Sequence, residues 1–134
     1  MHQGTFSVTT TQHMELVDIT SEIVRELKKS TIKRGRCFLF NPHTTAGLTI
    51  NEGADPAVRS DIIKGFREIV PLDYPFKHME GNSPSHIMAS LTGTSLDLLI
   101  DDSRLLLGTW QKIYFCEYDG PRVRKVYFRI TEDK

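Results

Sequence analysis

The sequence predicts an α+β domain built on a largely antiparallel β-sheet sandwich with two or three helices. Helix signals occur in three separate segments before residue 95, and from Ser95 onward the chain consists of strand-like runs. The 134 residues can bury one continuous core, and no internal repeat, low-complexity tract or linker divides them. We therefore expect a single domain over residues 1–134.

The N-terminal segment is predicted to form a strand and then a helix. Residues Thr5–Thr11 alternate and are rich in β-branched side chains, which favours a strand. Ile19, Ile23 and Leu27 recur four residues apart, the spacing of one face of an amphipathic helix. Thr20 is a suitable capping residue for its start.

Two strands and a second helix are predicted next. Arg36–Phe40 is interpreted as a buried strand and Gly47–Ile50 as another after a short break. Asp55 followed by Pro56 indicates a helix start, because a carboxylate caps the first turn and proline suits its first position. Pro71 ends that helix, since proline cannot continue it. Its apolar positions are Val58, Ile62, Phe66 and Ile69.

The C-terminal half begins with a third helix and then turns to strands. Ser83 and Pro84 repeat the start signal, and Gly93 suits the end of the helix. The predicted strands are Ser95–Ile100, Arg104–Leu107, Trp110–Tyr118 and Val123–Thr131. Asp119–Arg122 has the composition of a turn between the last two strands.

The charge balance argues against nucleic-acid binding. Lys plus Arg and Asp plus Glu number 17 each, so no net field attracts a polyanion. A local basic group near the C-terminus is interpreted either as solvated residues of a strand or as a pocket for a small anion. It consists of Arg122, Arg124, Lys125 and Arg129.

Membrane and export signals are missing from the sequence. No apolar run approaches the roughly 20 residues that cross a bilayer, and the first residues lack the basic head and apolar centre of a secretory signal. Cys37 and Cys116 each lie inside an apolar strand-like run, which is typical of buried free thiols. We expect a cytoplasmic protein that binds neither membrane nor nucleic acid.

Histidines in loops and at a helix start are the first candidates for chemistry. His43 follows a predicted strand, His78 lies in a long loop, and His86 lies in the first turn of the third helix. Zinc needs three or four donors that converge at roughly 2 Å, and the spacing of these residues does not by itself produce that. Taken singly, each is more common as a surface or hydrogen-bonded core residue than as a ligand.

Other polar side chains crowd the same segments. Asn51, Glu52 and Asp55 follow His43, and Glu80 and Asn82 lie between the other two histidines. Loops on a rigid scaffold concentrate function, which makes them binding candidates. The alternative for Asp55 is helix capping, and for Asn51 and Glu52 it is a strand end exposed to water.

The segment Gly108–Gln111 and the end of the strand after it hold further candidates. Trp110 is the only tryptophan and is predicted to pack in the core. Glu117 could meet Arg122 across the turn, either in a pocket or as a surface ion pair. No phosphate-binding glycine loop, nucleophile elbow or helical zinc signature occurs.

Three segments together resemble the YjbQ-like family, whose members are labelled secondary thiamine-phosphate synthases. The segments are HTTAGLTINEGADP (His43–Pro56), the spaced His78, Gly81, Asn82 and His86, and LLLGTWQKIYFCEYDGPR (Leu105–Arg122). Their order and spacing match, and the resemblance covers nearly the whole chain.

The resemblance implies a large antiparallel sheet and assembly as a homotrimer, with the polar loops on one pocket within or between subunits. It also implies a divalent metal, zinc as the candidate, or magnesium if the synthase activity holds. The implied ligands are His43, His78 and His86. The implied polar residues around them are Asn51, Glu52, Asn82, Gln111, Glu117 and Arg122.

Two departures from the family pattern stand out. Relatives commonly have an acidic residue and alanine before the final histidine, where this chain has Pro84 and Ser85 before His86. Relatives also usually have a glycine where this chain has Asp102 and Ser103, a change expected to affect only a hairpin turn.

Three functional hypotheses follow, and the sequence leaves open whether catalysis is the main role. The first is an enzyme of phosphorylated small molecules, a thiamine-phosphate synthase-like transferase whose activity can be incidental. In it a cation and Arg122 would hold phosphate groups. The second is a metal-dependent hydrolase with Glu52 as the base. The third is a non-catalytic trimer that binds a metal or a small molecule.

Overall fold

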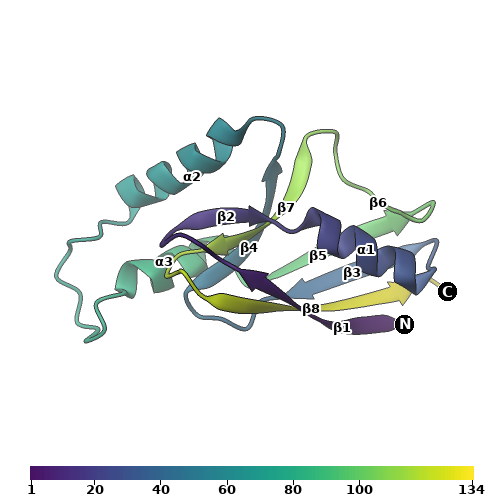
Figure 1. The fold of residues 1–134 in the computed structure, drawn as a ribbon, viewed down its shortest axis with the longest axis horizontal. Helices are drawn as coiled ribbons and strands as arrows, with labels where there is room; N and C mark the ends of the chain where they lie inside the picture. Colours follow the sequence, from purple (N-terminus) through teal and green to yellow (C-terminus); the bar gives the residue numbers. More distant parts are fainter.

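The computed structural model describes residues 1–134 and contains two antiparallel β-sheets and three helices (Figure 1). The larger sheet has the order β1–β8–β3–β5–β6, with β1 (His2–Thr9), β8 (Val123–Glu132), β3 (Gly35–Phe40), β5 (Ser95–Asp101) and β6 (Arg104–Leu105). The smaller has the order β2–β7–β4, with β2 (Glu15–Asp18), β7 (Gln111–Glu117) and β4 (Ala46–Glu52). The helices are α1 (Thr20–Ser30), α2 (Pro56–Ile69) and α3 (Ser83–Thr92). The predicted α+β class is confirmed.

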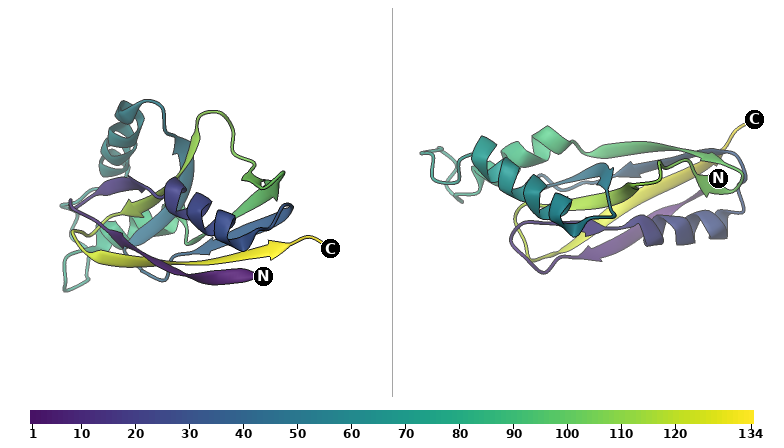
Figure 2. Two further views of the ribbon diagram at one scale, coloured as in Figure 1. Left: turned by 45° about the vertical axis from the view of Figure 1, so that its right-hand side comes forward. Right: turned by 90° about the horizontal axis from the view of Figure 1, so that it is seen from above.

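One hydrophobic core lies between the two sheets and is closed by α1. The helix contributes Ile19, Ile23 and Leu27, the residues whose spacing predicts it. Burial of this stripe on apolar strand residues drives the packing of α1, because each buried aliphatic side chain stabilises the fold by about 1.5–3 kcal/mol. Figure 2 shows α1 near both chain termini and apart from α2 and α3.

A second core covers the other face of the smaller sheet. Strand β7 is central, and its side chains alternate between the two cores. Ile113 and Phe115 enter the first core, whereas Tyr114 and Cys116 enter the second, where residues of α2 and α3 pack. Both faces of β7 are therefore covered, and this strand fixes the helices relative to the larger sheet.

The helix boundaries confirm most of the sequence signals. Asp55 Oδ1 accepts a hydrogen bond from Ala57 N (2.9 Å) at the start of α2, which ends at Ile69. The capping role predicted for Thr20 is wrong. Thr20 is already helical, its backbone N donates to Asp18 Oδ1 (2.9 Å), and its hydroxyl accepts from Ile113 N (2.9 Å), which ties the helix to β7.

Three apolar predictions are also wrong. Trp110 is 63% exposed because it lies in the connection before β7 and not in the strand. Phe38 and Phe40, predicted in a buried strand, are 41% and 40% exposed. Only one face of β3 meets the core, through Cys37 and Leu39, so the alternate side chains lie on the open face of the larger sheet.

The turn residues Asp102 and Ser103 confirm the expected hairpin. Both have positive φ, 49° and 60°, as a tight two-residue turn between antiparallel strands requires. Both cysteines are free and buried, as expected. None of the helices combines the length and the apolar character that spanning a bilayer requires.

Replacement of Ile23 by alanine is expected to lower the free energy of unfolding by about 2–5 kcal/mol, because the side chain is fully packed between α1 and the sheets. Urea denaturation measures the change. Lys28→Ala, on the exposed face of the same helix, is the matched control and should change stability by less than about 0.5 kcal/mol. Equal effects of the two substitutions would contradict the packing of α1.

Candidate functional site

A polar hollow of about 410 Å³ opens where the β3–β4 loop, the start of α3 and the β7–β8 turn meet. None of its lining residues is hydrophobic. They are Pro42, His43, Thr44, Thr45, His78, Glu80, Asn82, His86, Asp119, Arg122 and Arg124. Segments far apart in the sequence thus supply one continuous polar surface.

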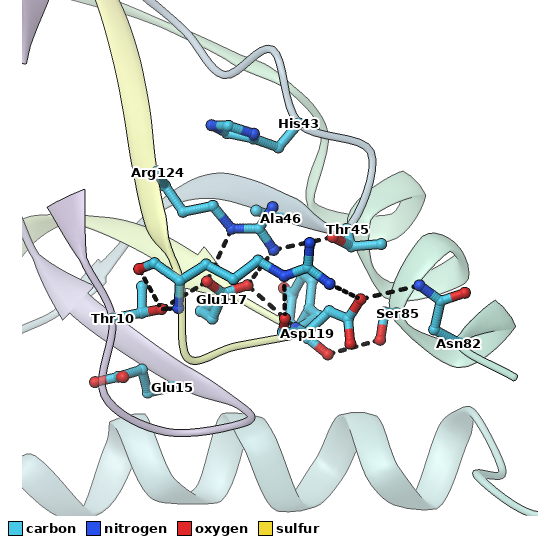
Figure 3. A network of polar contacts seen from close by, with 12 residues as sticks. Thr10, Glu15, His43, Thr45, Ala46, Asn82, Ser85, Glu117, Asp119 and Arg124 are labelled. Atoms are coloured by element: carbon cyan, nitrogen blue, oxygen red, sulfur yellow. Dashed lines mark hydrogen bonds and ion pairs between the residues drawn. The ribbon is translucent and has the colours of Figure 1, made fainter. Parts of the chain in front are cut away.

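Arg124 lines the hollow and forms a buried ion pair with Glu117 (Figure 3). Arg124 is 5% exposed and Glu117 is completely buried. Arg124 Nε donates to Glu117 Oε1 (2.9 Å), and Nη2 donates to Oε2 and also to Thr45 Oγ1 (2.9 Å). This two-pronged geometry is the strongest form of the arginine–carboxylate contact.

Glu117 receives further donors that keep it ionised. Thr10 Oγ1 donates to Oε1 (2.7 Å) and Asp119 N donates to Oε2 (3.1 Å). Burial by itself would raise the pKa of Glu117, but the hydrogen bonds from Arg124, Thr10 and Asp119 outweigh it and leave the pKa below its ordinary value. Glu117 therefore connects β7 to β8 and to the end of the first strand, and neither of its carboxylate oxygens is free for a ligand.

The β7–β8 turn carries a second arginine on the rim. Arg122 Nη2 donates to Asp119 Oδ2 (3.0 Å), and Asn82 Nδ2 donates to the same oxygen (2.9 Å). Asn82 Oδ1 is buried and has no hydrogen-bond partner. Ser85 Oγ donates to Tyr118 O (2.6 Å), so the start of α3 is fastened to the turn.

The turn fits against the β1–β2 connection only because residue 120 is glycine. A Cβ atom there would lie 2.4 Å from Gln12 O and 2.9 Å from Thr10 Oγ1. Thr10 N donates to Arg122 O (2.9 Å), and Arg122 N donates to Thr10 Oγ1 (2.8 Å). These close contacts hold the backbone of Arg122 at the rim of the hollow.

His43 is held by its ring and its backbone. Its Nε2 accepts a hydrogen bond from Lys125 N (3.0 Å), and its backbone N donates to Asn41 Oδ1 (2.9 Å). Burial lowers the pKa of His43, and the positive charge of Arg124 lowers it further. The imidazole is therefore neutral at pH 7.

His78 and His86 form a pair on the other wall. Their ring centroids lie 5.3 Å apart in a T-shaped contact. None of the four nitrogens of the two rings takes part in a hydrogen bond within the chain. His78 is exposed and His86 is half-buried. Glu80, the carboxylate between them in sequence, lines the same hollow.

Comparison with known proteins places the whole domain. The family described as UPF0047 protein YjbQ-like matches residues 4–133. The chain belongs to this family. It is 44% identical to UPF0047 protein YugU of Bacillus subtilis over 94% of this chain and 96% of the relative. It is 47% identical to a UPF0047 protein of Methanocaldococcus jannaschii over 96% of this chain and 94% of the relative.

Solved structures of related proteins share the fold. A YjbQ/UPF0047 family protein from Clostridium acetobutylicum superposes with a TM-score of 0.93 at 44% identity, covering 96% of this chain and 99% of the other. A hypothetical protein from Aeropyrum pernix gives a TM-score of 0.94 at 33% identity, covering 99% and 100%. A YbjQ-like protein from Sulfolobus solfataricus, described as of unknown function, gives a TM-score of 0.94 at 31% identity, covering 98% and 97%.

The donors fit the divalent metal implied for the family only in part. His43, His78 and His86 all line the hollow, but no three histidine, cysteine or carboxylate side chains stand close enough to hold one ion. The lone pair of His43 Nε2 is occupied by Lys125 N–H. His78 and His86 have free ring nitrogens, and Asn82 Oδ1 is an unpartnered acceptor nearby.

Three of the predicted polar residues, Asn51, Glu52 and Gln111, lie away from the hollow. Asn51 and Glu52 end β4 and pair with Lys112 and Gln111 of β7, whereas the hollow lies before the start of β4. A strand advances about 3.3 Å per residue, so the length of β4 separates these side chains from the histidines. The expectation that Glu52 stands beside the histidines of its own chain is wrong.

The expected contact between Glu117 and Arg122 across the turn is also wrong. Arg124 is on the buried face of β8 and pairs with Glu117, whereas Arg122 lies in the turn before that strand and pairs with Asp119. The sequence left two interpretations of the basic group near the C-terminus, solvated strand residues or a pocket for a small anion. The second fits Arg122 and Arg124, because both line the hollow.

Removal of either member of the buried pair is expected to cost about 3–5 kcal/mol of stability, because the remaining charge stays buried without a partner. Glu117→Gln and Arg124→Met test the single losses by urea denaturation. The double variant should be destabilised by clearly less than the sum of the single variants. An additive result would show that the two side chains are not coupled.

Acidification is expected to weaken the fold through His43 and then through Glu117. Both pKa values are lowered by folding, so each contribution is present above the pKa of the unfolded chain and is lost as the pH falls. The contribution of His43 to stability starts to be lost near pH 6.5, and that of Glu117 near pH 4.5. His43→Gln keeps an acceptor for Lys125 N but does not titrate, so the stability gap to wild type should change between about pH 7.5 and pH 5. A constant gap would contradict the lowered pKa of His43.

Proposed function

We propose that the hollow binds a small phosphorylated molecule and acts as a thiamine-phosphate synthase-like transferase. The observation that supports this most is the lining, which is wholly polar and offers two arginines and three histidines to phosphate oxygens. A volume of about 410 Å³ suits a small metabolite.

The charges in the hollow indicate that it needs a further cation to hold a phosphate. Arg122 is paired with Asp119, and Arg124 is paired with Glu117. Glu80 adds another carboxylate to the lining. Since no positive charge is left over among these residues, a divalent cation would offset the charge of a diphosphate.

The proposed reaction joins a pyrimidine methyl diphosphate to a thiazole phosphate. The thiazole nitrogen uses its lone pair to form a bond to the methylene carbon, and the electron pair of the broken carbon–oxygen bond leaves with pyrophosphate. Arg122 would bind the departing phosphate oxygens, and the fixed ring of His43 would orient them. A divalent cation held by His78 and His86 would supply charge against the pyrophosphate.

Assembly as a homotrimer is part of the proposal, because it would give Glu52 a place in the chemistry. Phe38, Phe40 and Tyr127 lie exposed on the open face of the larger sheet, and Trp110 is exposed near the end of β4. Exposed apolar groups of this kind favour subunit contacts. In a closed ring one end of a subunit faces a different end of the next, so Glu52 could approach a neighbour's hollow.

A metal-dependent hydrolase is the second candidate, supported by the position of Glu80. This exposed carboxylate lines the hollow with the His78–His86 pair and could accept a proton from water. The two candidate reactions differ in the molecule that receives the pyrimidine methyl group, which is water in the hydrolase and the thiazole phosphate in the transferase. The hydrolase releases pyrophosphate without the thiazole, whereas the transferase requires it.

Arg122→Ala is expected to reduce thiamine-phosphate formation at least tenfold, because an arginine–phosphate contact contributes about 1.5–3 kcal/mol. The assay measures product and pyrophosphate with and without the thiazole phosphate. Arg129→Ala removes an arginine of strand β8 that lies outside the hollow, so it is the control and should retain activity. Absence of turnover in the wild type, or equal losses in both variants, would contradict the proposal.

Glu52→Gln is expected to lower metal-dependent hydrolysis of the diphosphate about a hundred- to ten-thousand-fold if its carboxylate serves a neighbour's hollow as the base that deprotonates water. Light scattering should give the mass of a trimer. Mixed refolding of inactive Glu52→Gln with inactive Arg122→Ala chains should then restore roughly a quarter of the activity, since random rings create intact composite sites. A monomeric mass, or no recovery on mixing, would rule out the composite site.

A further inference from the structure

We propose that His43 is a fixed hydrogen-bond donor to the ligand through its Nδ1–H, and that it is not a metal ligand. The metal-free imidazole already has its Nε2 lone pair engaged by a backbone amide. The ligand in question is an oxyanion oxygen such as that of a phosphate group, so the donor role rests on the proposed function. The geometry that excludes metal ligation by His43 does not depend on the proposed function.

The first argument is that His43 completes a backbone ladder that proline interrupts. Strands β3 and β8 pair until Phe40 meets Tyr127. Continuation of that register would place Pro42 opposite Lys125, but proline has no N–H and the chain leaves the sheet. The imidazole of His43 folds back and accepts the hydrogen bond of Lys125 N at 3.0 Å.

The second argument concerns the tautomer. A backbone amide can only donate, so His43 Nε2 must be the unprotonated nitrogen that accepts. In a neutral imidazole the proton then resides on Nδ1. Nδ1 makes no hydrogen bond within the chain, and the residue lines the hollow. Neither nitrogen therefore offers a free lone pair, and the ring can only donate.

The third argument is rigidity. The Asn41 side chain accepts from His43 N (2.9 Å) and donates to Ala46 O (2.7 Å), which fixes the loop. The ring also makes an edge contact with Phe115 at 6.4 Å between centroids. Rotation of the ring toward a metal would leave Lys125 N–H without its partner, at a cost comparable to a lost hydrogen bond.

The surroundings explain why the ring stays neutral. The charged groups that face His43 are Arg124 and Glu117 (Figure 3). Lys125, whose backbone N donates to the ring, is the third. Burial and the charge of Arg124 lower its pKa, and Glu117 offsets only part of this effect. Any metal in the hollow would then depend on His78 and His86 with oxygen donors, which gives the three histidines two separate roles.

Nitrogen-15 NMR of histidine-labelled wild-type protein tests the tautomer directly. Metal-free protein near neutral pH should show one histidine with a protonated Nδ1 and an unprotonated Nε2, assigned to His43 by its loss in His43→Asn. Addition of Zn²⁺ should leave the nitrogens of this histidine unshifted. A reversed tautomer, or a metal-induced shift of its Nε2, would overturn the inference.

Binding measurements separate the donor role from metal ligation. Co²⁺ stoichiometry should be unchanged in His43→Leu and reduced in His78→Ala and His86→Ala. Affinity for inorganic pyrophosphate should fall about tenfold to a hundredfold in His43→Leu. His43→Asn should recover most of it, because its amide nitrogen occupies the place of Nδ1.

Two results would refute the inference, and they differ from failure of the proposed function. Loss of cobalt in His43→Leu alone would make His43 a ligand. Equal pyrophosphate affinity in wild type and His43→Leu would remove the donor role. If wild-type protein binds no pyrophosphate at all, the phosphate site itself is wrong, whereas the tautomer and the cobalt stoichiometry still decide whether His43 is a ligand.

Discussion

The buried pair of Arg124 and Glu117 is the constraint on which the candidate site depends. It joins β8 to β7, and through Thr45 and Thr10 it also holds the β3–β4 loop and the end of the first strand. Removal of two charges from water is costly, and only a fully hydrogen-bonded geometry offsets that cost. A small displacement of any of these loops would leave a buried charge without a partner. The pair therefore specifies one arrangement of the loops more than it adds net stability.

The same pair determines the electrostatics of the hollow. Because Glu117 compensates Arg124 and Asp119 compensates Arg122, the arginines offer direction and hydrogen bonds but little net charge. The positive charge of Arg124 also favours the neutral form of His43. A hollow with neutral donors on one wall and a free histidine pair on the other suits a ligand that arrives with a divalent cation.

The sequence was sufficient for the elements with local signals and insufficient for contacts decided by register. The helical spacing of Ile19, Ile23 and Leu27 and the capping by Asp55 depend on near neighbours, and both are confirmed. The exposure of Trp110 and the pairing of Glu117 depend on where a strand starts and on which strand lies beside it. A shift of one residue reverses the side of every side chain, which is why these predictions are wrong. The short strand β2 gave no signal of its own.

The difference between local sequence signals and contacts decided by strand register also applies to the candidate site. His43, His78 and Asn82 lie in polar connections and His86 lies in the first turn of α3, and the structure brings all four to one hollow. Arg124 appeared in the sequence only as one member of a basic group, and its inward direction follows from the alternation along β8. Glu52 is close to His43 along the chain but lies at the other end of a strand. Closeness in sequence is therefore a poor guide to closeness in space when a strand intervenes.

Calorimetric titration of inorganic pyrophosphate into the protein, with and without Zn²⁺ or Mg²⁺, tests the central claim most directly. The arginines are already paired, so metal-free protein should bind pyrophosphate weakly. A divalent cation should tighten binding at least tenfold. Tight binding in metal-free protein, unchanged by added metal, would contradict the account of a charge-compensated hollow.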